Sequence, residues 1–134
     1  MKEISELNFP ETLRYAQDHE WARQENGNIV VGISDYAQDQ LGDIIYVELP
    51  QEGDSFEKGE ELGTLESVKA VSEVFMPVSG EIVAVNTELG ETPALVNEDP
   101  YGRGWLVEVK PTDLGEMADL MSAEQYAEML RRLE

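Results

Sequence analysis

The spacing of short β-rich runs between glycine and proline turns limits the folds open to this chain more than any other feature. From Gly42 onward, such runs cover residues 44–49, 62–66 and 71–76, and a turn containing Pro and Gly spans 50–53. Runs this short and this regularly spaced are typical of a β-sandwich or barrel. We therefore expect a mainly β fold, with a last strand over 105–109 that stops at Lys110-Pro111.

A weak internal repeat divides this β-rich region. The sequence Gly-Asp-Ile-Ile-Tyr-Val at 42–47 is echoed by Gly-Glu-Ile-Val-Ala-Val at 80–85, thirty-eight positions later. Six matched positions of this kind can arise by chance in any β protein, so the repeat is suggestive only. Two similar halves would bracket Lys69.

Local signals also predict a hairpin and a short helix ahead of the repeat. Residues 18–33 indicate a hairpin that turns at Asn26-Gly27, because Asn-Gly favours the tight turns of β-hairpins. Ser34 can cap a helix over 35–41, with Asp35 at its positive end. Gly42 is placed to end that helix in the left-handed conformation.

A second helix is predicted at the C-terminal end of the sequence, where Ser122 and Gln125 form a capping box. An apolar stripe follows on one helical face, made of Tyr126, Met129, Leu130 and Leu133. Amphipathic helices usually bury this side, so packing against the sheet is favoured over a partner-binding face.

Charge and composition exclude several kinds of function. The chain has 29 Asp and Glu against 9 Lys and Arg, a net charge of −20, which disfavours nucleic acid and anionic membranes as partners. Docking onto basic patches of other proteins fits this charge, and so does simple solubility or a saline cytosol. The lack of cysteine excludes disulfides, Cys-based metal sites and Cys nucleophiles. Without a signal-like or membrane-length apolar run, we expect a cytoplasmic protein.

Lys69 lies in a segment, 65–73, that is flanked by predicted strands, so it should sit at or near a hairpin tip with its ammonium exposed. Exposed lysines are usually just solvated surface residues, and geometry alone does not single this one out.

Seven motifs along the chain do single it out. They stand at 18–21, 32–43, 46–50, 66–70, 77–81, 100–101 and 104–105. In these motifs the sequence resembles the lipoyl and biotinyl carrier family and, within it, the H proteins of the glycine cleavage system. The resemblance covers nearly the whole chain. Biotinyl domains flank their lysine with Met, and 2-oxo acid dehydrogenase lipoyl domains place Asp before it, whereas Val68 and Ala70 flank Lys69 here.

For the fold, the resemblance implies one lipoyl-carrier domain over 1–134, a flattened β-barrel or sandwich of two quasi-symmetric halves. The N-terminal hairpin and the C-terminal helix would be extensions of that domain. For function, it implies a lipoic acid amide on Lys69, attached by a lipoylating enzyme. The arm would take an aminomethyl group from a pyridoxal-phosphate glycine decarboxylase to a tetrahydrofolate-dependent aminomethyltransferase, and a flavin-dependent dihydrolipoamide dehydrogenase would reoxidise it.

The resemblance also assigns neighbouring residues. Glu66 and Ala70 resemble recognition elements for the lipoylating enzyme, although ordinary solvation at a strand end accounts for Glu66 equally well. Asp18, Glu20 and Glu73 match a groove that shelters the loaded arm, where carboxylates could pair with its ammonium. Met76 replaces the small polar residue implied at that groove, and the lone histidine, His19, fits a structural role better than catalysis.

Three other functions stay open at this point. The lipoylated chain could relay lipoyl groups to other lipoyl-dependent complexes, or it could be an interaction module that kept the fold without the cofactor. An independent enzyme is disfavoured, because the sequence has no cysteine, one histidine, no glycine-rich phosphate loop and no metal-ligand cluster.

Overall fold

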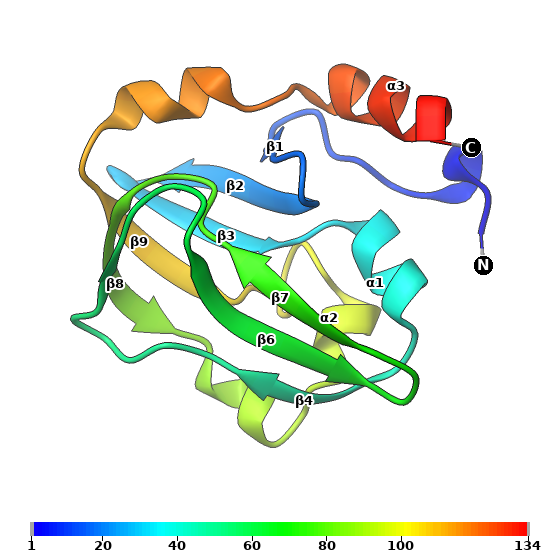
Figure 1. The fold of residues 1–134 in the computed structure, drawn as a ribbon, viewed down its shortest axis with the longest axis horizontal. Helices are drawn as coiled ribbons and strands as arrows, with labels where there is room; N and C mark the ends of the chain where they lie inside the picture. Colours follow the sequence, from blue (N-terminus) through cyan, green and yellow to red (C-terminus); the bar gives the residue numbers. More distant parts are fainter. Residues whose placement is uncertain (1, 134) are drawn as a thin grey trace.

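The computed structural model describes residues 2–133 and arranges them as two antiparallel sheets with short helices around them (Figure 1). The strands are β1 (Arg14–Tyr15), β2 (Glu20–Glu25), β3 (Asn28–Ile33), β4 (Ile44–Glu48), β5 (Ser55–Phe56), β6 (Glu61–Ser67), β7 (Val71–Phe75), β8 (Gly80–Val85) and β9 (Val107–Pro111). The α-helices are α1 (Asp35–Leu41), α2 (Leu95–Glu98) and α3 (Ala123–Leu133), and the 3₁₀ turns are η1 (Ile4–Glu6), η2 (Thr87–Gly90) and η3 (Leu114–Asp119).

The sheets confirm the predicted β-sandwich. One has six strands in the order β1-β2-β3-β9-β8-β5, and the other has three in the order β4-β6-β7. Over the described residues the arrangement is therefore a flattened sandwich of two sheets and not a closed barrel. The N-terminal hairpin, β2–β3, is part of the larger sheet, because β3 pairs directly with β9.

Two apolar clusters form the core. The larger draws residues from both sheets, among them Val31, Leu65 and Ile82, and so holds the sheets together. The smaller contains Trp21 and lies under α3, which supplies Tyr126 and Leu130. Of the predicted stripe of α3, Tyr126 and Leu130 are buried and Met129 is partly buried, whereas Leu133 is 65% exposed.

The internal repeat has a structural counterpart in two matching irregularities. A bulge interrupts β4 between Ile44 and Tyr46, and another interrupts β8 between Ile82 and Ala84. The two bulges stand at equivalent positions of the repeat. Bulges are specific local features, so their agreement supports the prediction of two quasi-symmetric halves.

Local turn chemistry behaves largely as predicted. Asn26 and Gly27 have φ of 52° and 84°, as the expected hairpin turn requires. Ser34 Oγ accepts the Ala37 N–H at 3.2 Å and caps α1. Gly42 has φ 77° but ψ −162°, so it is not in the left-handed helical conformation that we predicted. The chain must extend at once there, because β4 begins two residues later.

The last strand is displaced from its predicted position. β9 covers Val107–Pro111 instead of 105–109. Trp105 belongs to the preceding turn, where its N–H donates to the Gly102 carbonyl at 3.2 Å. Within residues 2–133, no helix has both the length and the apolar character needed to cross a bilayer.

Candidate functional site

The turn that carries Lys69 links β6 to β7 at one end of the smaller sheet. Its backbone is held by Ser67, whose N–H donates to the Ala70 carbonyl at 2.8 Å. The Ser67 hydroxyl is buried and accepts the N–H groups of Lys69 and Ala70 at 3.2 and 3.1 Å. Val68 N–H donates to the Asp43 carbonyl at 3.2 Å, which ties the turn to the segment before β4. Lys69 therefore stands on a fixed backbone.

Ser67 is a site residue that our sequence analysis did not single out. The available signal was its place two residues before Lys69, since serine hydroxyls often accept N–H groups of the next residues in turns. The Lys69 side chain itself is exposed and extends over Gly42. A methyl group on Gly42 would lie 3.4 Å from Lys69 Cε, an ordinary van der Waals contact, so the two residues are close neighbours.

A cavity of about 290 Å³ begins beside this turn. The predicted groove residues Asp18, Glu20 and Glu73 all line it, so the structure brings Glu73 next to two acids that lie far from it in the sequence. Further lining comes from α1 and its flanks and from β6 and β7, including Tyr36. The predicted groove residue Met76 is instead buried in the larger core cluster and is not part of this lining.

Glu20 is the most unusual of the three acids, because its side chain is only 2% exposed. One carboxylate oxygen accepts the Phe75 N–H at 3.2 Å, which fixes the side chain against β7. Burial raises the pKa of Glu20 to about 7, the nearby charge of Asp18 adds to the rise, and the Phe75 hydrogen bond opposes it. At neutral pH this carboxyl can therefore switch between its neutral and ionised forms.

His19 stands between two of these acids in the sequence, is half-buried, and makes the contacts of a structural residue. Its Nδ1 is 2.8 Å from the Tyr126 hydroxyl, and its ring lies 5.0 Å from that of Tyr36. Burial lowers the pKa of His19, with Asp18 opposing the shift, so the imidazole is neutral near pH 7. A neutral, hydrogen-bonded ring at the cavity wall fits the structural role that we predicted for it.

Comparison with known proteins identifies the group to which this arrangement belongs. A family model described as glycine cleavage H-protein matches residues 13–133. The chain belongs to the glycine cleavage H-protein family. As a member, it is a carrier component of the glycine cleavage system and not itself an enzyme, as the sequence predicted, and the family carries lipoic acid.

Individual H proteins match it over nearly their whole length. The glycine cleavage system H protein of Halothermothrix orenii is 50% identical over 128 residues, 96% of this chain and 100% of that protein. A probable glycine cleavage system H protein of Pyrococcus abyssi is 53% identical over 135 residues, 99% of this chain and 100% of that one. The crystal structure of a glycine cleavage system H protein from Mycobacterium marinum superposes with a TM-score of 0.84 at 41% identity, covering 91% of this chain and 98% of that one.

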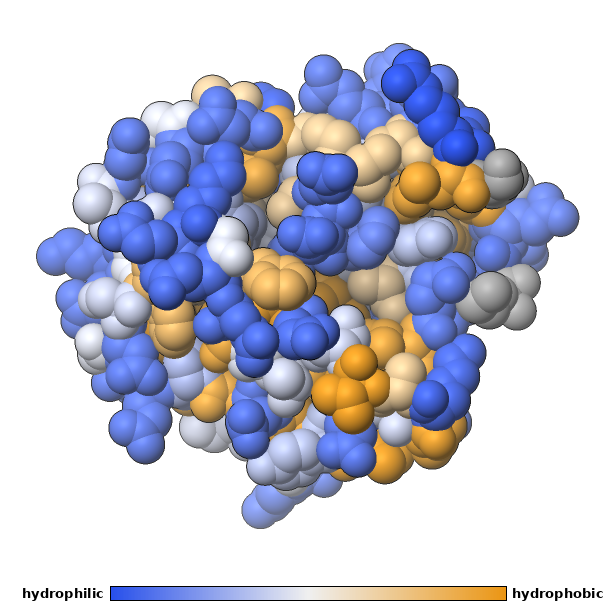
Figure 2. Space-filling view, viewed as in Figure 1, coloured by the Kyte–Doolittle hydropathy of each residue, from blue (hydrophilic) through white to orange (hydrophobic). Residues whose placement is uncertain are grey.

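Apolar side chains surround the turn of this H-protein family member. Ile45, Tyr46, Val68 and Val71 are each more than half exposed, and we call them the apolar collar. Figure 2 shows hydrophobic residues at the lower right, where β4 and the β6–β7 turn lie. Tyr46 and Val71 stand on either side of Glu66 across three paired strands, so the carboxylate sits between two apolar neighbours. Sequence reasoning missed the collar, because the β4 bulge turns two successive residues outward.

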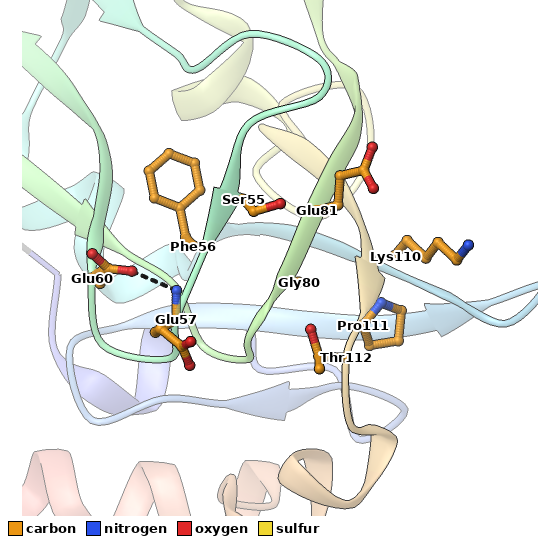
Figure 3. Close-up of a pocket in the computed structure, with 9 residues that line it drawn as sticks. All are labelled: Ser55, Phe56, Glu57, Glu60, Gly80, Glu81, Lys110, Pro111 and Thr112. Atoms are coloured by element: carbon orange, nitrogen blue, oxygen red, sulfur yellow. Dashed lines mark hydrogen bonds between the residues drawn. The ribbon is translucent and has the colours of Figure 1, made fainter.

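A second hollow lies at the far end of the β6–β7 hairpin and contains none of the predicted site residues (Figure 3). Its lining includes the acids Glu57, Glu60 and Glu81 together with Lys110. Glu60 Oε1 accepts the Glu57 N–H at 2.6 Å, so that carboxylate closes a turn. The predicted site residues therefore lie at the Lys69 end of the molecule, away from this hollow.

Proposed function

We propose that Lys69 carries lipoic acid as an amide and that the chain uses this arm to transport the aminomethyl group of glycine cleavage. When attached, the lipoyl group supplies the cyclic disulfide that accepts the aminomethyl group. The chain would position this group for transfer between partner enzymes. The observation that carries the proposal is the exposed Lys69 on a turn fixed by Ser67, beside a cavity lined with acids. A flexible arm needs such a rigid anchor.

The cavity supports a sheltering role for Asp18, Glu20 and Glu73 toward the loaded arm, whose end is a primary ammonium. An ammonium entering the cavity would stabilise the ionised form of Glu20, because an opposite charge nearby lowers the pKa of a carboxyl. The buried, charge-assisted contact would then hold the arm out of water. Glu20 is the leading candidate for that contact, since it is the most buried of the three acids.

Around the turn, the apolar collar and Glu66 offer a surface on which partner proteins could dock. Glu66 and Ala70 would be read by the lipoylating enzyme before the arm is attached. The loaded and unloaded forms would meet the pyridoxal-phosphate decarboxylase, the tetrahydrofolate-dependent aminomethyltransferase and the flavin dehydrogenase. The net charge of −20 suits partners with basic surfaces near their active sites. That residues 1–134 form one carrier domain, and that the protein is cytoplasmic, both remain predictions.

The proposal is tested by lipoylating the purified chain and measuring aminomethyl transfer with purified partners. Mass spectrometry should find the lipoyl adduct on Lys69, and the Lys69→Arg variant should lack both adduct and transfer. Lys110→Arg is the matched control, since Lys110 is also exposed but lies by the second hollow. It should keep both. Appreciable transfer by Lys69→Arg, or an adduct on another lysine, would sink the assignment.

A further inference from the structure

The C-terminal helix reaches the walls of the acidic cavity through one side chain. Tyr126, on α3, is fully buried, and its hydroxyl lies 2.8 Å from His19 Nδ1 and 2.7 Å from Ser34 Oγ. Burial raises the pKa of Tyr126, so the phenol stays protonated and can donate. Tyr126 does not line the cavity itself. It joins the segment entering β2 to the N-terminus of α1.

His19 needs such support because its backbone is in a region that side chains seldom adopt. Its φ is 81°, in a chain where Asn26 is the other non-glycine residue of positive φ among those described. Such a conformation is unfavourable in itself and persists only where the surroundings enforce it. The His19 N–H donates to the Ala16 carbonyl at 3.0 Å, and the His19 carbonyl accepts the Ser34 N–H at 2.9 Å.

The strained residue stands where it matters for the cavity. His19 separates Asp18 from Glu20, and all three line the cavity on one side. Ser34 caps α1, which supplies Tyr36 and other residues of the opposite wall. The Tyr126 hydroxyl contacts both residues at once, and so adds a side-chain link to the backbone hydrogen bond that joins His19 and Ser34.

We propose that Tyr126 is a positioning residue that holds His19 and the α1 cap together and thereby keeps the cavity closed around Glu20. The assignment of this cavity to the loaded arm rests on the proposed function. The positioning role itself concerns the unmodified chain. It gives α3 a task beyond covering the smaller core cluster.

Tyr15 provides a matched control within the same cluster. It is fully buried and stacks on Tyr126 with ring centroids 4.8 Å apart and planes 5° from parallel. Its hydroxyl donates to the Pro10 carbonyl at 2.8 Å, away from the cavity. Tyr15→Phe and Tyr126→Phe each delete one buried, hydrogen-bonded hydroxyl, so they should lower stability to a similar degree.

The experiment titrates the Glu20 carboxyl by ¹³C NMR in the unmodified full-length chain. Opening the cavity admits water and lets the carboxyl ionise more easily, so Tyr126→Phe should lower the Glu20 midpoint by about one unit. The Phe75 N–H, which donates to the Glu20 carboxylate, should exchange its hydrogen with solvent about tenfold faster in the same variant. Tyr15→Phe should leave both near the wild-type values.

A second variant guards against a Tyr126→Phe chain that fails to fold. Ser34→Gly deletes the hydroxyl that Tyr126 contacts, while glycine remains a tolerable helix cap. It should lower the Glu20 midpoint in the same direction. An unchanged midpoint in both variants, or an equal shift in Tyr15→Phe, overturns the proposal. A chain that fails to accept lipoate would contradict the proposed function and leave these titrations interpretable.

Discussion

Replacing Glu20 by glutamine should stabilise the folded chain more and more as the pH rises from 5 to 8. The folded-state pKa of Glu20, about 7, lies above the ordinary glutamate value of 4.5 because the side chain is buried. Between these values the unfolded chain ionises this carboxyl while the folded chain keeps it neutral, so rising pH destabilises the wild type. Below the lower value both states are neutral and the penalty disappears. A pKa difference of this size corresponds to roughly 3 kcal/mol in full, of which about 2.5 kcal/mol develops between pH 5 and 8.

Urea unfolding of wild type and Glu20→Gln at several pH values measures this effect as a difference of two curves. Glutamine keeps an oxygen that can accept the Phe75 N–H and has no charge to desolvate. The difference also removes the pH dependence that the other acids contribute to both proteins. Glu73→Gln deletes an exposed charge from the same cavity wall and should change stability by no more than about 0.5 kcal/mol at pH 7.5. Parallel curves for wild type and Glu20→Gln would refute the argument from burial.

Three further changes test the site and its support. Ser67→Ala removes the acceptor of two turn N–H groups and should lower the free energy of unfolding by about 1 kcal/mol. An unchanged urea midpoint would contradict the fixed turn. Gly32→Ala would place a methyl group 2.6 Å from the Trp21 ring and should cost about 1–3 kcal/mol, which thermal unfolding would detect; wild-type stability would contradict this close packing. Tyr46→Ser should slow lipoylation several-fold as followed by mass spectrometry, whereas Leu133→Ser, which changes another exposed apolar residue, should not; equal rates in the two variants would exclude a role for the collar.

The parts of the fold that were predictable are those written in short stretches of sequence. Asn26-Gly27 fixes a hairpin turn through its own backbone preferences, and Ser34 caps the helix that directly follows it. Strand periodicity located β6, β7 and the turn between them. The two-residue strands β1 and β5 escaped notice, because such short pairings leave no period to detect.

The parts that were not predictable depend on residues brought together only by folding. His19 and Tyr126 are 107 positions apart, and no local pattern marks one as the partner of the other. Two residues of the collar, Ile45 and Tyr46, face outward because of a bulge, which breaks the in–out alternation used to infer the facing of side chains. For Asp18, Glu20 and Glu73 the resemblance to a family indicated a shared groove, whereas the burial that makes Glu20 distinctive becomes visible only in the packed structure.

The fixed turn at Lys69 also affects how often an arm attached there would be docked in the cavity. Anchor and cavity belong to neighbouring strands, since Glu73 lies on the strand that leaves the turn. Docking of the arm into the cavity would then be intramolecular, with an effective concentration in the range of about millimolar that dilution cannot change. A partner enzyme would have to outcompete that local concentration to draw the arm out. The fraction of free carrier with its arm docked would therefore not depend on the carrier concentration, and drawing the arm out would require an encounter with the right protein.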